Sequence, residues 1–241
     1  MEIRLHGRPF AVIMRTPGRD RDLTAGFLLS ERVIACSDDL GAIAHCTDEN
    51  ARAENIVNVT LTDASTLDRM VESRRNVTTN SSCGLCGRRT IESLVTDMPP
   101  LTAAWTIAAP ALVALPERLR AAQSTFDVTG GLHAAALFGC DGPLLDAAED
   151  VGRHNAVDKV IGRMLLREAL PLSRHVLCVS GRTSYEIIQK AALAGVPVVA
   201  AVSAPSSLAI ELADACGMTL AGFVRGDGFN IYTHPGRVTS A

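Results

Sequence analysis

The fold class follows from one short segment, HVLCVSGRTSYE, at residues 175–186. Apolar side chains dominate the run from His175 to Val179, as they do in buried strands. A Ser-Gly-Arg turn comes next, and Thr183 through Glu186 has the pattern of a capping box, which predicts a helix start. The order strand, polar turn, helix recurs at 197–216, and a third apolar run covers 218–224. Apolar runs alternating with helices indicate an α/β half with a mostly parallel or mixed sheet and helices on both faces.

The segments before residue 100 follow a less regular pattern. Two strand-like segments flank His6-Gly7-Arg8-Pro9 and indicate a hairpin, and the apolar spacing from Leu23 to Ile34 indicates an amphipathic helix. We predict a smaller α+β N-terminal subdomain over 1–100, which carries a thiol loop at 78–89, and an α/β subdomain over 101–241. The other expected elements are strands at 42–46 and 55–61, helices at 67–72, 88–95, 112–125 and 155–168, and a loop at 126–133.

The thiol loop contains Cys83-Gly84-Leu85-Cys86, the only two of the seven cysteines that stand close together. A Ser/Thr/Asn-rich approach precedes the pair, and Arg88-Arg89 follows it at the start of the expected helix. Free N–H groups at a helix N-terminus and neighbouring arginines stabilise a thiolate, and can lower a cysteine pKa from about 8.5 to roughly 3.5–7.5. We therefore predict a reactive thiol in this loop.

Three chemistries remain open for this C-x-x-C pair. Half of a structural zinc site needs two further ligands, usually a second close pair, and the other five cysteines are scattered. A thioredoxin-like dithiol should directly follow a buried strand, whereas a polar loop precedes this pair. A sulfur carrier needs one nucleophilic thiolate on a loop that can visit a donor and an acceptor, and this case fits best.

A zinc-dependent deaminase is excluded by its own chemistry. Such enzymes use H-x-E followed later by P-C-x-x-C, with the glutamate moving protons. Here His133-Ala134-Ala135 has alanine in place of the glutamate, and the thiols come before the histidine. The sequence therefore excludes deaminase activity, but it does not exclude a fold related to that of the deaminases.

Polar turns follow the expected strands of the second half. Ser180-Gly181-Arg182 and the segment 203–207 each join a strand to a helix, and Arg225-Gly226-Asp227-Gly228 forms a third turn. The carboxyl ends of strands in open α/β sheets bind phosphorylated ligands, because free N–H groups and the helix dipole face the anion there. We therefore predict a nucleotide-like ligand. Candidate contacts from these turns and from neighbouring polar segments are His133, His154, Asn155, Ser180, Gly181, Arg182 and Ser203.

The block from Asp146 to Lys159 is dense in polar residues at the head of an amphipathic helix. One account makes it a helix cap in which His154 and Asp158 pair at i,i+4. The other makes it a pocket wall, in which His154 and Asn155 reach a ligand and Asp158 orients His154. Both accounts stay open at this point.

Composition excludes several classes of protein. Hydrophobic residues make up 47% of the 241, which is too many for a disordered chain. A net charge of −3 provides no overall attraction to nucleic acid or to anionic lipid. No apolar run reaches the roughly 18 residues of a membrane span, and charged residues near the start leave no room for a signal-peptide core. Isolated cysteines fit a reducing compartment. We expect a cytoplasmic protein that binds neither nucleic acid nor membrane.

Taken together, several stretches resemble the FdhD/NarQ family of formate dehydrogenase accessory sulfurtransferases. They are distributed over nearly the whole chain, and the block from Glu149 to Lys159 is the most specific of them. Family members usually have a short acidic-Pro-Leu lead-in before the segment that matches Ile3, and this sequence does not contain it. The matching stretches are AGFLLSE (25–31), SCGLCG (82–87), TGGLHAA (129–135), EDVGRHNAVDK (149–159), SGR (180–182), and 222–225 through 232–234.

The resemblance implies a sulfur carrier that takes sulfur from a cysteine desulfurase as a cysteine persulfide. The carrier then transfers the sulfur to the molybdenum or tungsten centre of bis-molybdopterin guanine dinucleotide, for formate dehydrogenase. Cys83 would carry the persulfide and Cys86 would assist. Family members look like homodimers, and their C-terminal part resembles the cytidine-deaminase fold. GDP would mimic the cofactor, and no resident metal is expected. The family's cofactor-binding segment maps to Phe223, Val224, Arg225, Gly226, Asp227 and Gly228.

A second hypothesis comes from a different class of function. The chain could be a binding module that holds a nucleotide or a sugar phosphate at the Ser-rich turns, with the C-x-x-C pair as a zinc knuckle for a partner protein. Metal analysis and ligand binding separate the two hypotheses.

Overall fold

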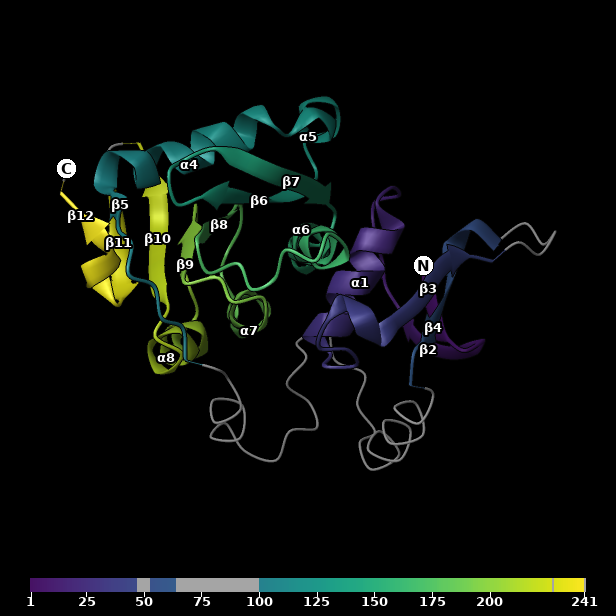
Figure 1. Cartoon of the computed structure of the whole chain (residues 1–241). Coiled ribbons are helices and arrows are strands. Elements are labelled where there is room, and N and C mark those ends of the chain that lie inside the picture. Colours follow the sequence, from purple (N-terminus) through teal and green to yellow (C-terminus); the bar gives the residue numbers. More distant parts are fainter. Residues whose placement is uncertain (47–52, 64–99, 227, 241) are drawn as a thin grey trace.

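The computed structural model describes residues 1–46, 53–63, 100–226 and 228–240, and Figure 1 shows its course. Several predictions lie outside these residues. They concern the loop 78–89 with Cys83 and Cys86, the helices at 67–72 and 88–95, and Asp227.

The described residues of the N-terminal half form a small mixed sheet and the helix α1, which match the strands and the amphipathic helix predicted before residue 64. The strand order is β2-β1-β4-β3, in which β1 pairs antiparallel with β2 and parallel with β4. Val57, Val59 and Leu61 alternate with more exposed residues along β4, so one face of this sheet is buried. The elements are β1 (Glu2–Leu5), β2 (Arg8–Val12), α1 (Asp20–Ser30), β3 (Leu40–His45) and β4 (Ile56–Leu61).

The C-terminal half is built on a mixed six-stranded sheet of order β11-β10-β9-β8-β6-β7. Its three central neighbours β8, β9 and β10 are parallel, while β6, β7 and β11 join antiparallel to their neighbours. This confirms the predicted α/β class with a mixed sheet. The strands are β6 (His133–Gly139), β7 (Leu144–Asp150), β8 (His175–Val179), β9 (Val198–Ala201), β10 (Thr219–Arg225) and β11 (Gly228–Thr233).

Helices cover both faces of this sheet (Figure 1). Alternate residues of the strands point to opposite sides, so that Cys178 packs with Leu115 in the cluster under α4, and Leu177 packs with Ile161 in the cluster under α6. The helices are α4 (Ala109–Ala121) and α5 (Ser124–Thr129) on one side, and α6 (Arg153–Leu166), α7 (Tyr185–Leu193) and α8 (Ser207–Ala215) on the other. A two-stranded pair, β5 (Ile107–Ala108) and β12 (Val238–Thr239), flanks α4.

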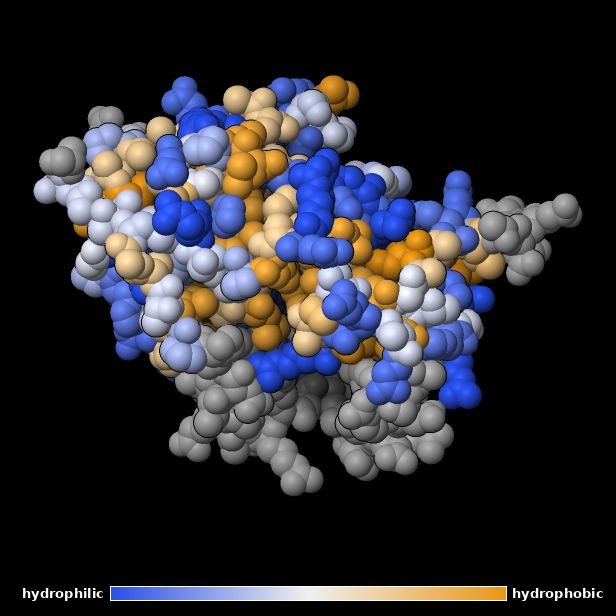
Figure 2. Space-filling model, viewed as in Figure 1, coloured by the Kyte–Doolittle hydropathy of each residue, from blue (hydrophilic) through white to orange (hydrophobic). Residues whose placement is uncertain are grey.

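Helix α1 of the N-terminal half packs directly on α6. Two glycines permit the close approach, because a Cβ at Gly26 would overlap the carbonyl of Asp158, and a Cβ at Gly162 would overlap the carbonyl of Asp22. One buried apolar cluster runs from the N-terminal sheet through this contact to α7 and α8. Figure 2 shows hydrophobic surface near the middle of one face, with hydrophilic side chains around it.

Three details differ from the sequence predictions. Residues 126–129, expected in a loop, belong to helix α5, which covers Ser124–Thr129. Strand β7 was not predicted, because its alternating burial begins with the exposed pair Leu144 and Leu145. The N-cap of α7 is Ser184, not Thr183 of the expected capping box, and no side chain accepts a cap hydrogen bond there. Among the described helices, none has the length and apolar character to cross a membrane.

Candidate functional site

The candidate site lies at the edge where the parallel strands of the large sheet end. The strand order places Arg225 of β10, Val202 after β9, Ser180 after β8 and His133 at the start of β6 in succession along this edge. Backbone hydrogen bonds continue the ladder beyond the strands, since Val202 N–H donates to the Val179 carbonyl and Thr183 N–H donates to the Ala204 carbonyl, both at 3.1 Å. These hydrogen bonds hold the strand ends in fixed positions relative to one another, and we call this edge of the sheet the platform.

A cavity of about 820 Å³ opens over this platform, between the strand ends and helices α4 and α5. Four predicted ligand contacts line it, namely His133, Ser180, Arg225 and Gly226. Ser180 Oγ accepts the Ala134 N–H at 2.8 Å, so its own proton remains available to a ligand. The volume is within the range of pockets that hold small molecules and cofactors.

The segment from Gly222 to Arg225 is irregular in a way that shapes the cavity. The register of β10 against β11 shifts between Gly222 and Arg225, and Phe223 has a φ of 54°, a left-handed conformation that costs energy for a bulky residue. Phe223 N–H donates to the Ser203 carbonyl at 3.2 Å. The Arg225 guanidinium lies 5.8 Å from the Phe223 ring centroid. Val224, in contrast, is fully buried in the core under α4.

A second group of basic side chains lies next to the platform. Gly181 leaves room for the His133 ring, because a Cβ there would come within 3.2 Å of its Nδ1. Burial lowers the pKa of His133, and the positive charges of Arg153 and Arg182 lower it further. Within the described ranges, no carboxylate lies within ion-pair distance of either arginine, and Arg153 Nε is buried without a hydrogen-bond partner. This group is suited to binding an anion.

His154 faces the start of α7. Its Nε2 lies 2.9 Å from Ser184 Oγ and 3.8 Å from Glu186 Oε2. Burial, followed by the charge of Arg153, lowers the pKa of His154 to about 4, while Glu186 acts in the opposite direction. The imidazole is therefore neutral at physiological pH, and the Ser184 hydroxyl is engaged with it instead of capping α7.

The structure contradicts both sequence accounts of Asp158. Its carboxylate does not contact His154. It accepts hydrogen bonds from Lys190 Nζ at 2.7 and 2.8 Å and from Ser30 Oγ at 2.9 Å, and it is buried between α1, α6 and α7. The i,i+4 spacing was misleading, because residue 158 lies on the core face of α6. Asn155 donates to the Met14 carbonyl and to Asp150 Oδ1, so its amide links β7 to the N-terminal half.

The two helix starts behind the platform are not equivalent. At α8, Ser206 Oγ accepts the Ala209 N–H at 3.2 Å, and this cap uses a donor that a phosphate could otherwise bind. At α7 no side chain caps the helix. The sequence treated the two turns alike, and the structure leaves only the first of them open to an anion.

The described cysteines differ in their chemistry. Burial raises the pKa of Cys178 to about 12 and that of Cys216 to about 11, so both thiols stay protonated at neutral pH. Cys36 is exposed, and Cys46 and Cys140 are half-buried, each in a different part of the fold. Cys83 and Cys86 lie outside the described residues.

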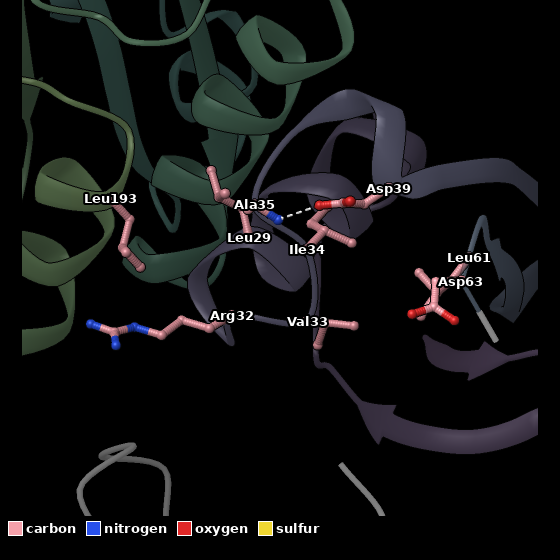
Figure 3. Close-up of a pocket in the computed structure, with 9 residues that line it drawn as sticks. All are labelled: Leu29, Arg32, Val33, Ile34, Ala35, Asp39, Leu61, Asp63 and Leu193. Carbon is pink, nitrogen blue, oxygen red and sulfur yellow. Dashed lines mark hydrogen bonds between the residues drawn. The ribbon is translucent and has the colours of Figure 1, made fainter. Parts of the chain in front are cut away.

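Two further cavities lie in the N-terminal half. One, of about 450 Å³, is bordered by the end of α1 and by Leu193, and its wall contains the hydrogen bond from Ala35 N–H to Asp39 Oδ2 (Figure 3). The other, of about 590 Å³, lies beside Arg15, His45 and Cys46. Neither contains a predicted ligand contact. In the part of the chain that the structure describes, no cluster of His, Cys, Asp and Glu side chains could hold a metal ion.

Sequence reasoning missed one wall of the large cavity. Glu117 and Gln123, on α4 and just after it, line the space opposite the strand ends. Pro110, Val113 and Glu117 follow a helical spacing along the cavity, while Leu112 and Leu115 are buried in the core. Helical periodicity showed which residues of α4 face away from the core, but a cavity beside them could not be read from that pattern.

Comparisons with known proteins agree on one family. The sequence profile of the FdhD/NarQ family matches residues 1–239. Sulfur carrier protein FdhD of Streptomyces coelicolor is 52% identical over 248 residues, which cover 99% of this chain and 86% of that protein. The protein of the same name from Mycobacterium tuberculosis is 48% identical, with coverages of 99% and 89%.

A solved structure supports the same conclusion. The crystal structure of a formate dehydrogenase accessory protein from Desulfotalea psychrophila is similar to this chain, with a TM-score of 0.76 and 25% identity, over 99% of this chain and 87% of that one. Sequence matches over almost the full length and a shared fold give one conclusion: the chain belongs to the FdhD/NarQ family.

Proposed function

We propose that this protein is a sulfur carrier for formate dehydrogenase maturation. Cys83 accepts sulfur from a cysteine desulfurase as a persulfide. The protein then transfers that sulfur to the molybdenum or tungsten centre of bis-molybdopterin guanine dinucleotide, which binds at the strand-end cavity. The proposal places both partners and the reaction in the cytoplasm, with the protein acting as a homodimer.

Family membership supports the sulfur-carrying half of the proposal. Relatives about half identical to this chain are named sulfur carrier proteins, and the solved relative is a formate dehydrogenase accessory protein. The cysteines of the described part add a chemical argument. Cys178 and Cys216 are buried thiols of raised pKa, which makes them poor nucleophiles. These two cysteines are therefore poor carriers, and the C-x-x-C pair, which alone in the sequence has two neighbouring thiols, remains the proposed carrier.

The cavity is the main support for the second half of the proposal, the binding of the cofactor that accepts the sulfur. A guanine dinucleotide needs cations and N–H or O–H donors for its phosphates, and a concave surface for its rings. Arg225 has no ion-pair partner within the described residues, and the Ser180 hydroxyl can still donate. Arg225 can therefore form charge-assisted hydrogen bonds with a phosphate. The donor set fits the proposed acceptor.

The loading step is a thiol exchange. The Cys83 thiolate attacks the terminal sulfur of the donor's persulfide, the donor's S–S bond breaks, and the donor cysteine leaves as a thiolate. Delivery of the sulfur as sulfide requires two electrons. The Cys86 thiolate can supply them by forming a disulfide with Cys83, and a thiol reductant then restores both thiols.

A persulfide assay on single-cysteine variants tests the carrier assignment. The protein is incubated with a cysteine desulfurase and cysteine, and mass spectrometry locates the added sulfur atom. Cys83→Ala should abolish loading, whereas Cys86→Ala should retain part of it. Cys178→Ser is the matched control and should load as the unaltered protein does. Sulfur found only on Cys86 would reverse the two roles.

Metal analysis separates this function from a binding module with a zinc knuckle. Protein purified without chelator should contain no stoichiometric zinc bound through Cys83 and Cys86. One zinc per chain, lost in the Cys83→Ala variant, would favour the binding module.

A further inference from the structure

Two arginines lie on the far side of the platform from the large cavity. Arg153 is the first residue of α6, and Arg182 lies in the turn between β8 and α7. None of the described residues that line the large cavity belongs to α6 or α7. His133 lies between the two regions: it lines the cavity, and a Cβ at Gly181 would come within 3.2 Å of its Nδ1 and 3.8 Å of Arg153 Cδ. The arginines therefore lie on the α6–α7 side of the sheet edge.

The fold leaves both of these arginines without a partner. Arg153 Nε is buried and has no hydrogen-bond partner, and within the described ranges no carboxylate lies within ion-pair distance of Arg153 or Arg182. Asp150, at the end of β7 just before α6, is already paired with Lys159 at 2.7 Å. Buried donors almost always have partners, because leaving one unpaired is costly. The two guanidinium groups are therefore available to an anion.

Two helix N-termini meet beside these arginines. His154 Nε2 lies 2.9 Å from Ser184 Oγ, so the first turn of α6 contacts the N-cap of α7. No side chain accepts a cap hydrogen bond at the start of either helix. Thr183, just before the N-cap of α7, is 1% exposed, and its Oγ1 has no hydrogen-bond partner. Uncapped N–H groups at a helix N-terminus attract anions and amount to a charge of about +0.5.

The charges around this point are positive overall. Both histidines are neutral at physiological pH, because burial and then the charge of Arg153 lower the pKa of His154 to about 4 and lower that of His133 below its ordinary 6.5. Glu186 is the acidic group that faces them, with its Oε2 at 3.8 Å from His154 Nε2. The two arginines and the two helix N-termini outweigh this carboxylate and leave roughly two positive charges. An anion with two negative charges would balance them.

We propose that Arg153, Arg182 and the converging starts of α6 and α7 form a binding site for a phosphate-type dianion, separate from the large cavity. A guanidinium group binds phosphate oxygens through parallel N–H donors, and the helix N–H groups supply further donors. Free phosphate and the phosphate group of a larger molecule share this chemistry. The inference does not depend on the proposed function, since neither arginine lines the cavity assigned to the cofactor.

Calorimetric titration of the full chain with inorganic phosphate, in a buffer free of other oxyanions, tests the inference. Arg153→Gln should weaken phosphate binding about 10- to 100-fold, the range of one charge-assisted contact. Arg182→Gln should weaken it as well, and because this side chain is exposed the variant should stay folded. Arg167→Gln, at the opposite end of α6, is the matched control and should bind phosphate as the unaltered protein does.

The histidines provide a second measurement. A bound dianion favours the protonated imidazole, so phosphate should raise the pKa of His133 and of His154. NMR spectroscopy of the imidazole signals, with and without saturating phosphate, measures this rise. A titration with methyl phosphate then distinguishes the two sources. Affinity equal to that of inorganic phosphate supports a site for the phosphate group of a larger molecule, and much weaker binding supports a site for free phosphate.

The outcomes separate this site from the proposed cofactor cavity. Absence of phosphate binding, or unchanged affinity in both Arg153→Gln and Arg182→Gln, would overturn the site. Saturating GDP should leave the phosphate affinity within about threefold of its value without GDP. Direct competition by GDP would make the arginines part of the nucleotide cavity and would also overturn the separate site. Failure of GDP to bind, with phosphate bound at the arginines, would count against the cofactor cavity alone.

Discussion

The α1–α6 contact and the strand-end edge use the same kinds of residues in opposite ways. Beside the contact, charges are paired at 2.7 Å: Lys190 with Asp158 and Lys159 with Asp150 are buried pairs within the C-terminal half, and the half-buried Arg19 pairs with Asp146 across the two halves. At the edge, the charged and amide groups of Arg153, Arg225 and Gln123 have no such partner among the described residues.

The difference shows how to separate structural polar residues from functional ones in this molecule. A buried charge needs a partner to offset its lost hydration. The fold supplies that partner beside the contact, and hydrogen bonds from Ser30 to Asp158 and from Lys159 to the Thr16 carbonyl tie these buried pairs to the N-terminal half. The edge leaves its polar groups open, and the buried Arg153 Nε has no hydrogen-bond partner there, a cost in stability that a bound ligand can recover. Removing residues from each region should therefore affect different measurements.

The largest loss of stability should follow from breaking a pair at the contact. Lys190→Met leaves the Asp158 carboxylate buried without its cation, which should lower the free energy of unfolding by about 3–5 kcal/mol. Urea unfolding at neutral pH measures the loss. The double variant Asp158→Leu with Lys190→Met removes both charges and should recover most of it. If the single variant lowers the free energy of unfolding by less than about 1 kcal/mol, the Lys190–Asp158 pair does not stabilise the packing of these helices.

A smaller loss should follow from filling the helix crossing. In Gly162→Ala the new methyl group would overlap the Asp22 carbonyl, so α1 and α6 must move apart, at a cost of about 1–3 kcal/mol. Thermal unfolding measures this cost. Gly236→Ala is the control, because a Cβ there meets nothing within 4 Å. Equal melting temperatures for both variants would show that the crossing is not tightly packed.

The lowered pKa of His154 predicts a dependence of stability on pH. In the unfolded chain this histidine binds a proton below about pH 6.5, but in the folded protein only below about 4, mainly because of burial and Arg153. Stability should therefore fall as pH decreases from 6.5 toward 4. His154→Asn should reduce this fall by on the order of 1–2 kcal/mol, because a quarter of the side chain is exposed and solvent screens part of the effect. Urea unfolding at several pH values measures the slope, and an unchanged slope would contradict the assignment.

The smallest stability effect, with a large functional one, is expected at Arg225. This side chain is exposed, so Arg225→Ala should change the free energy of unfolding by no more than about 0.5 kcal/mol. Loss of its charge-assisted contact should weaken GDP binding about 10- to 100-fold. Thermal shift with GDP compares the variant with the unaltered protein. If GDP raises the melting temperature of the variant as much as that of the unaltered protein, Arg225 does not bind the phosphates.

The sequence identified the parallel strands β8, β9 and β10 and the polar turns after them, because apolar runs and turn residues act over a few neighbouring positions. Ser180 was chosen on that basis and His133, Arg225 and Gly226 with the help of the family resemblance, and the structure gathers all four around one cavity. The same local reasoning failed for Asp158. Its partner Lys190 lies 32 residues away, and only the packing of α6 on α7 brings the two together.

Local chemistry in the chain was thus enough to specify an α/β half, its turns, a C-x-x-C pair and the family resemblance. Periodicity, turn residues and cysteine spacing are properties of neighbouring positions, so they can be read from the sequence without knowledge of the fold. Packing alone made Asp158 a buried ion-pair partner, and packing alone set Glu117 and Gln123 opposite the strand ends. The reason is physical: a side chain's partner and its access to a cavity depend on which distant elements come to lie beside it.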